Sequence, residues 1–163
     1  IPYIIDVPSG VRAGQASDEL VETVDLYPTL CELAGLDLPY ELDGASLVPV
    51  LNDASAHTDG VAFHVFPRGK LLGRAVRTDR YRLVEWKTPG SPAEEAVLEL
   101  YDYETDPEES RNLAAEQPEV VAELRAILAK QPEAKLQFVA KNGAGKAPGQ
   151  AKGRNKRQRA AKS

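Results

Sequence analysis

Short runs of alternating apolar and polar residues dominate the middle of the chain. Arg74–Thr78 and Tyr81–Trp86 flank a tight polar turn, and this arrangement predicts an antiparallel β-hairpin. Val97–Tyr103 predicts a further strand, and the apolar run Val61–Phe66 predicts another one before the hairpin. Because a lone hairpin is only marginally stable in water, the sequence indicates a small antiparallel sheet of three or four strands.

The period of two places alternate residues of the hairpin on opposite faces of the sheet. In the first strand, the two alternating sets are Arg74, Val76 and Thr78 against Ala75 and Arg77. In the second strand, they are Tyr81, Leu83 and Glu85 against Arg82, Val84 and Trp86. Each face therefore carries both apolar and charged side chains.

A helical period follows the strands. Glu119–Lys130, with Pro118 at its start, places five apolar residues on one side: Val120, Val121, Leu124, Ile127 and Leu128. We expect this side to cover one face of the sheet and form a two-layer α+β unit.

The first third of the chain is less regular. The apolar run Ile1–Val7 suits a strand that is covered on both faces. Asp25–Gly35 predicts a short amphipathic helix, with Asp25 as N-cap and Gly35 as the residue that ends it. Its apolar face consists of Leu26, Leu30, Leu33 and Ala34. A brief helical turn is expected between Ser46 and Leu51.

Length and composition set further limits. The 163 residues, of which 42% are apolar, can bury one modest core. The chain contains no Met and begins at Ile1, so we expect it to be the C-terminal third of a larger protein. No apolar run approaches the ~20 residues of a membrane span, and no membrane partner is expected. The single cysteine, Cys31, excludes an intrachain disulfide and suits a packed, inert position.

Charge is divided unevenly along the chain. All 25 acidic residues precede Lys141, whereas residues 141–163 are rich in Lys and Arg. This basic tail lacks large apolar residues and is expected to be disordered. It suits either a polyanion contact or a solubilising terminus. We do not expect a nucleic-acid partner, because no aromatic residues are interleaved for base stacking.

Four stretches resemble a known family. They are "VETVDLYPTLCELAGLDLP", "LDGASLVPVL", "RTDRYRLVEW" and "LELYDYETDPEESRNLA", in this order. Together they resemble the C-terminal part of sulfatases of the alkaline-phosphatase-like superfamily, most closely the iduronate-2-sulfatase group. The resemblance extends from Ile1 to Ala129 and implies the C-terminal portion of an α/β sulfatase fold.

The resemblance also implies what the chain lacks. Sulfatases use a formylglycine nucleophile, made from Cys or Ser in a Cys/Ser-x-Pro-x-Arg motif, and a divalent metal, typically Ca²⁺. No such motif is present, since Cys31 is followed by Glu32 and Leu33. The family's metal ligands and catalytic Lys would precede Ile1. We therefore expect no catalytic residue and no metal ligand in this chain, and no activity from the chain alone.

Three residues are candidates for substrate binding. Arg68 leaves a predicted strand in the Phe66-Pro67-Arg68 stretch, which resembles a cleft-lining segment of the family. A guanidinium binds carboxylate or sulfate through two parallel hydrogen bonds. His64 lies on the same predicted strand, where a packed histidine is the alternative to a ligand. Arg77 is the third candidate.

The other side chains have structural alternatives too, and for Arg68 the alternative is a solvated loop arginine. Arg77 lies inside the hairpin, and a structural ion pair with Asp79, Asp102 or Asp106 is the alternative to substrate contact. Trp86 suits either a ring that stacks on a sugar or a packed residue of the sheet.

The combined interpretation has three segments and one main function. Residues 1–59 are expected to end the N-terminal sulfatase subdomain and link it to the next. Residues 60–140 form the C-terminal sheet subdomain, and residues 141–163 the tail. The resemblance implies that the parent hydrolyses sulfate esters of a sulfated carbohydrate, and that it is periplasmic or secreted. The alternatives are a phosphoesterase or phosphonate hydrolase of the same superfamily, or an interaction module that uses its tail.

Overall fold

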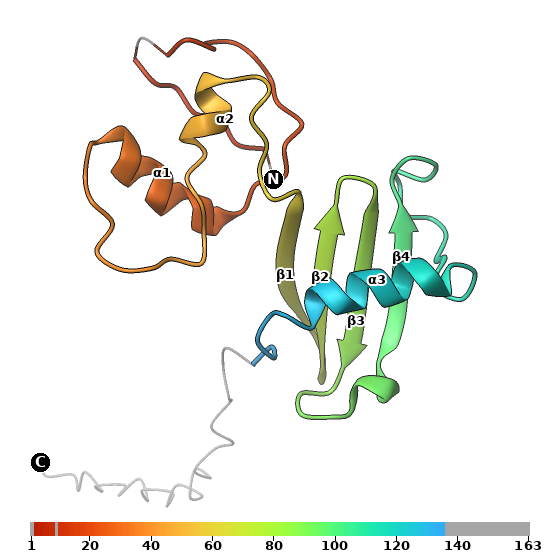
Figure 1. Ribbon diagram of the computed structural model, residues 1–163. Coiled ribbons are helices and arrows are strands. Elements are labelled where there is room, and N and C mark those ends of the chain that lie inside the picture. Colours follow the sequence, from red (N-terminus) through yellow and green to blue (C-terminus); the bar gives the residue numbers. More distant parts are fainter. Residues whose placement is uncertain (1, 9, 136–163) are drawn as a thin grey trace, which may run out of the picture.

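The computed structural model describes residues 2–8 and 10–135, and the predicted tail at 141–163 lies outside them (Figure 1). The elements, in chain order, are η1 (Thr23–Asp25), α1 (Leu26–Leu33), α2 (Val48–Asn52), β1 (Val61–Arg68), β2 (Leu71–Thr78), β3 (Tyr81–Lys87), η2 (Ala93–Glu95), β4 (Val97–Asp102) and α3 (Pro118–Leu128). Within this part of the chain, no helix is both long enough and apolar enough to traverse a bilayer.

The predicted sheet is confirmed and has four strands. Their order is β1-β2-β3-β4, and every neighbouring pair is antiparallel. Each strand therefore pairs with the next one along the chain, through tight turns before β2 and β3 and through residues 88–96, which include η2, before β4. Gly69, in the turn between β1 and β2, has φ of 62°, a backbone conformation that glycine adopts without strain.

Helix α3 lies across one face of the sheet, as its apolar period predicted (Figure 1). Its residues Val121, Leu124 and Leu128 pack against fully buried side chains of the strands, which are Val76, Leu83 and Leu100. Burying an aliphatic side chain of this size is worth about 1.5–3 kcal/mol. This cluster is the main core of the described chain.

Salt bridges and hydrogen bonds hold the end of α3 to the same face. The guanidinium of Arg74 donates to the carbonyl of Leu128, and Lys87 Nζ lies 2.9 Å from Glu133 Oε1. Hydrogen bonding from Lys87, together with the nearby Arg74 charge, lowers the pKa of Glu133. The buried cations on this face are therefore compensated.

The opposite face of the sheet has a smaller apolar cluster of Ala75, Val84 and Trp86, with Leu71 packed against it. Among residues 2–8 and 10–135, no helix covers it (Figure 1). We call this side of the sheet, opposite α3, the open face.

The N-terminal region departs from the sequence prediction at its start. The structure gives Pro2–Val7 no strand, although the apolar run predicted one. A strand needs a neighbour that takes up its backbone hydrogen bonds, and no described strand lies beside this segment. Hydrophobicity alone therefore gave the wrong prediction.

Helix α1 is confirmed, with a shifted start. It begins at Leu26, after η1, and Asp25 makes no side-chain cap. The Asp25 carboxylate instead accepts hydrogen bonds from the backbone of Glu22 at 2.7 Å and Ala45 at 2.9 Å. Gly35 ends the helix with φ of 66°, as predicted.

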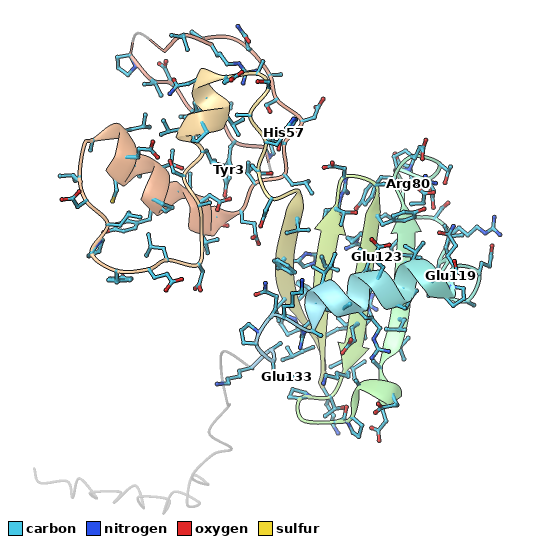
Figure 2. The ribbon with its side chains drawn as sticks, viewed as in Figure 1. Tyr3, His57, Arg80, Glu119, Glu123 and Glu133 are labelled. Carbon is cyan, nitrogen blue, oxygen red and sulfur yellow. The ribbon has the colours of Figure 1, made fainter. Side chains whose placement is uncertain are left out.

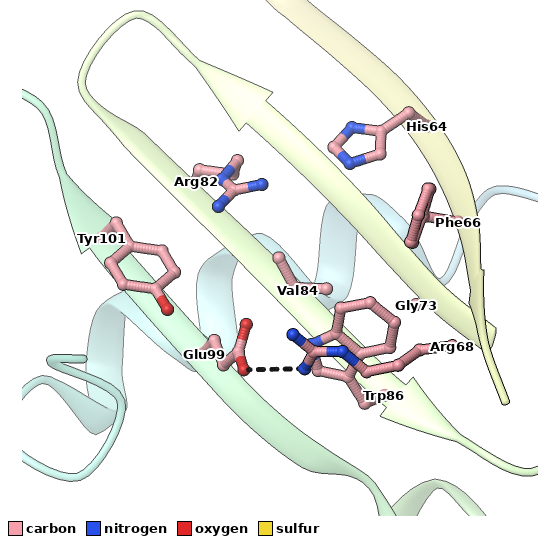
Figure 3. A pocket seen from close by; sticks show the side chains of 9 residues that line it. All are labelled: His64, Phe66, Arg68, Gly73, Arg82, Val84, Trp86, Glu99 and Tyr101. Atoms are coloured by element: carbon pink, nitrogen blue, oxygen red, sulfur yellow. Dashed lines mark ion pairs between the residues drawn. The ribbon is translucent and has the colours of Figure 1, made fainter. Parts of the chain in front are cut away.

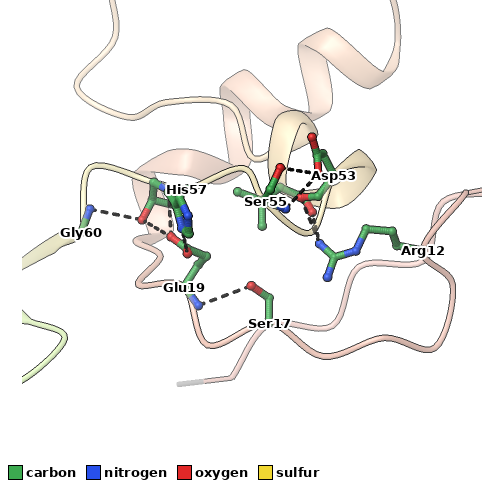
Figure 4. A network of polar contacts seen from close by, with 9 residues as sticks. Arg12, Ser17, Glu19, Asp53, Ser55, His57 and Gly60 are labelled. Atoms are coloured by element: carbon green, nitrogen blue, oxygen red, sulfur yellow. Dashed lines mark hydrogen bonds and ion pairs between the residues drawn. The ribbon is translucent and has the colours of Figure 1, made fainter.

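A polar network connects the N-terminal region to the loop before β1 (Figure 4). Glu19 Oε1 lies 2.7 Å from His57 Nδ1, and Glu19 Oε2 accepts a hydrogen bond from the Thr58 backbone at 2.8 Å. These bonds, led by that from Thr58, lower the pKa of Glu19. Glu22 Oε1 accepts a 2.7 Å bond from the backbone N–H of Phe63. Together these contacts fix where β1 begins.

Candidate functional site on the open face

A cavity of about 430 Å³ lies on the open face, and all four strands contribute to it (Figure 3). The register explains its composition, because residues paired across antiparallel strands share a face. Phe66 pairs with Gly73, which pairs with Trp86, and Val84 pairs with Glu99. The lining residues are His64, Phe66, Arg68, Gly73, Arg82, Val84, Trp86, Glu99 and Tyr101.

Arg68, the last residue of β1, presents its charge to this cavity. Its guanidinium carbon lies 4.8 Å from the centroid of the Trp86 ring, within the range of a cation–π contact. Its Nη1 lies 4.0 Å from Glu99 Oε1, and 67% of its side chain is exposed. The ring therefore orients a cation whose donors remain accessible to solvent.

Trp86 forms the base of the cavity. A Cβ at Gly73 would lie 2.6 Å from ring atom Cζ3, so the ring lies directly against the glycine backbone. Trp86 is 9% exposed, and its buried Nε1 has no hydrogen-bond partner in the described part of the chain. Trp86 is therefore packed into the sheet, and its ring contacts the guanidinium of Arg68.

His64 and Arg82 form the other end of the cavity (Figure 3). Partial burial, followed by the charge of Arg82, lowers the pKa of His64. The imidazole is therefore neutral near pH 7 and can accept or donate a hydrogen bond. Arg82 is tied by its Nη2 to Glu109, which also accepts from the hydroxyl of Tyr103.

Arg77, the third predicted substrate-binding residue, does not line the cavity. Its guanidinium lies 3.3 Å from the centroid of the Tyr103 ring, and its Nε donates to the Thr78 carbonyl at 2.8 Å.

Two of the three predicted acidic partners of Arg77 bind other groups, and among the described residues no ion pair joins Arg77 to the third, Asp79. Asp102 lies on the α3 face and accepts two bonds from Arg80, at 2.8 and 3.0 Å. This pairing lowers the pKa of Asp102. Asp106 accepts from the side chain of Ser110 and the backbone of Arg111. The prediction of an Arg77 ion pair was therefore wrong, because period-two geometry directs the Asp102 side chain away from the open face.

The residues present do not fit the nucleophile or the metal site of a sulfatase. Residues 2–8 and 10–135 contain no group of three or more His, Cys, Asp or Glu side chains that could hold a metal ion. Cys31 is buried in α1, consistent with the packing predicted for it. The open-face cavity instead presents the accessible guanidinium of Arg68, which suits an anionic, oxygen-rich group.

The sequence prediction missed several lining residues. Glu99 and Tyr101 were not singled out, although they belong to the predicted strand Val97–Tyr103, and Gly73 lies just before the predicted strand Arg74–Thr78. Extending the period-two pattern from the hairpin to Val61–Phe66 and Val97–Tyr103 would have placed them on one face. The remaining information, which is the cross-strand register, comes from the structure.

Comparison with known proteins identifies the family. A family described as N-sulphoglucosamine sulphohydrolase, C-terminal, matches residues 1–135. The chain belongs to this C-terminal sulfatase family. The predicted sulfatase resemblance is thereby confirmed.

Curated relatives carry sulfatase names. The chain is 32% identical over 130 residues to arylsulfatase K of Xenopus laevis, covering 76% of this chain and 24% of the relative. It is 34% identical over 137 residues to a delta 4,5-hexuronate-2-O-sulfatase of Bacteroides thetaiotaomicron, covering 78% of this chain and 27% of the relative. This sulfatase chain thus spans about a quarter of the length of these relatives.

A solved structure shares the fold. It is of a protein in complex with its substrate D-glucosamine-2-N,6-O-disulfate, at 25% sequence identity and a TM-score of 0.54. The match covers 65% of this chain and 22% of that protein. The predicted α+β architecture, with a small antiparallel sheet packed on a C-terminal helix, is therefore that of the C-terminal part of sulfatase structures.

Proposed function

We propose that this chain forms the C-terminal part of a sulfatase that hydrolyses sulfate esters of a sulfated sugar. The family match and the names of the relatives support this function. The hexuronate-2-O-sulfatase relative favours a 2-O-sulfated uronate, in line with an iduronate-2-sulfatase-like parent. The remaining three quarters of such a protein would supply the formylglycine and the Ca²⁺ site.

The observation that carries the proposal for this chain is the exposed guanidinium of Arg68 above Trp86. A planar guanidinium binds a carboxylate or sulfate through two parallel hydrogen bonds. Arg68 would hold an anionic group of the sugar, and the neutral imidazole of His64 would contact a neighbouring polar group. The open face would thus form one wall of the substrate cleft. Arg77, which packs against Tyr103, would contribute to substrate binding indirectly, without lining the cavity.

The proposal also assigns a role to exposed apolar residues near α1. Apolar side chains that are exposed along a single segment, here residues 24–40, suit a surface that contacts another protein surface. Here the occupant would be the remaining, N-terminal part of the same sulfatase, against which this chain would pack. The exposed residues are Val24, Tyr27, Leu30, Leu33, Leu36, Leu38 and Tyr40.

Replacing Arg68 tests the proposed substrate contact. In the full-length enzyme, Arg68→Ala is expected to raise KM for a sulfated uronate sugar about tenfold to a hundredfold, with kcat nearly unchanged. A hydrogen bond to a charged group is worth about 1.5–3 kcal/mol, and uniform loss of binding appears in KM. Steady-state kinetics on the sugar and on a small aryl sulfate, which lacks a second anionic group, measure the difference.

Arg111→Ala is the matched control for this experiment. Arg111 has the same side-chain exposure of 67% and pairs with Glu116 outside the cavity. It should leave both KM values unchanged. If Arg68→Ala weakened both substrates equally, or lowered only the melting temperature, Arg68 would be a structural residue and not a substrate contact.

A further inference from the structure

Glu99 is the acidic residue among those that line the open-face cavity. It lies on β4, in register with Val84 of β3, and 26% of its side chain is exposed. Its Oε1 is 4.0 Å from Arg68 Nη1 (Figure 3). A negative charge is therefore held beside the cation proposed to bind the substrate.

The separation of the two charges shows that they attract each other without sharing a hydrogen bond. Charge-assisted N–H···O bonds measure about 2.7–2.9 Å, as in the 2.8 Å contact between Arg80 and Asp102. At 4.0 Å, Arg68 keeps its donors for a third group, and Glu99, which also accepts from the hydroxyl of Tyr101, keeps further acceptor positions on its two carboxylate oxygens. A partly exposed pair at this distance is worth about 1 kcal/mol, so a ligand can compete with it.

A sugar in this cavity would lie beside a positively charged and a negatively charged side chain, which favour different substituents. Arg68 favours an anionic substituent, whereas Glu99 accepts a hydrogen bond from a hydroxyl group and repels a second anion. Both side chains are held in place on the sheet, as a selective binding site requires. Arg68 is held by the ring of Trp86, and Glu99 projects from the regular strand β4.

We propose that Glu99 is a specificity-determining residue of this sulfatase. It selects sugars that carry a free hydroxyl beside the anionic group bound by Arg68, and it disfavours sugars with an additional sulfate at that position. This inference rests on the proposed function of the open face. It adds a discrimination between substrates that differ in their degree of sulfation.

The test compares two sugars in the full-length enzyme. The probes are a 2-O-sulfated hexuronate disaccharide and the same disaccharide with one additional sulfate. Glu99→Gln keeps the size of the side chain and removes its charge. It is expected to raise the relative kcat/KM of the more sulfated sugar about fivefold, the change that corresponds to about 1 kcal/mol.

Two control variants make the result specific. Glu123→Gln removes the same charge from an exposed site on α3, on the other side of the sheet (Figure 2), and should leave the ratio unchanged. Glu99→Asp retains the charge and should keep a ratio close to that of the wild type. A ratio that is unmoved by Glu99→Gln, or moved equally by either control, overturns the proposal.

Binding measurements separate this inference from the proposed function. Dissociation constants of both disaccharides, measured by calorimetry on the wild type and on Glu99→Gln, give the same ratio without turnover. If the wild type hydrolyses neither sugar, the sulfatase activity on uronates fails, and the ratio of dissociation constants still decides the role of Glu99. If the wild type hydrolyses them and Glu99→Gln changes neither ratio, only the role of Glu99 fails.

Discussion

Gly73 is required at its position because the ring of Trp86 lies directly against its backbone. The three atoms closest to a Cβ built at Gly73 all belong to this ring, at 2.6 to 2.8 Å. The same ring carries the guanidinium of Arg68. Gly73 therefore positions the proposed anion-binding group without touching it.

Gly73→Ala is expected to destabilise the protein and to disturb the cavity. Overpacking of this kind costs about 1–3 kcal/mol, because the ring must move toward Arg68. Chemical denaturation of the full-length protein measures the loss. In a Trp86→Leu background the same substitution should cost less, since the clashing ring is gone. An equal cost in both backgrounds would show that the ring is not the cause.

Some residue roles could be predicted from the sequence and others could not. The turn at Gly69 follows from local patterns, whereas the predicted strand ended at Phe66 and the structure continues β1 through Pro67 to Arg68. The contact of Arg77 with Tyr103 depends on the tertiary structure, because Tyr103 follows the end of β4 and the fold brings its ring to the hairpin. The Arg68–Glu99 contact spans the sheet from β1 to β4 and depends on the register of three strand pairs.

At the scale of elements, the contact between α3 and the sheet is the main source of stability. Leu124 is 3% exposed and lies in the cluster with Val76, Leu83 and Leu100. This contact was predictable from the sequence. The apolar side of the helix and the apolar face of the sheet each need to be buried, and packing one on the other buries both. The strand predicted over Pro2–Val7 is absent from the structure, because an apolar pattern alone does not specify a pairing partner.

Leu124→Ala is expected to lower the free energy of unfolding by about 2–5 kcal/mol, the range for a buried leucine that leaves a cavity. Glu123→Ala changes the adjacent, exposed residue and should stay within about 0.5 kcal/mol. Urea denaturation of the full-length protein compares the two. Similar losses for both variants would mean that α3 does not pack through the predicted face.

At the scale of the whole molecule, the described residues cover one face of the sheet and leave the other face without a helix over it. Helix α3 covers one side of the sheet, whereas the open face and the apolar residues near α1 remain accessible. Both surfaces suit a chain that spans about a quarter of its sulfatase relatives. The family could be predicted from the sequence, because its long motifs follow in order. The cavity could not be predicted from the sequence, because its lining residues come from four strands whose register is set by the tertiary structure.

The most direct test of this account is a crystal structure of the full-length protein with a sulfated uronate sugar bound. We predict an anionic group of the sugar within about 3 Å of the Arg68 guanidinium, with the open face forming a wall of the cleft. A sugar bound away from the open face, with Arg68 covered by other parts of the protein, would contradict the account.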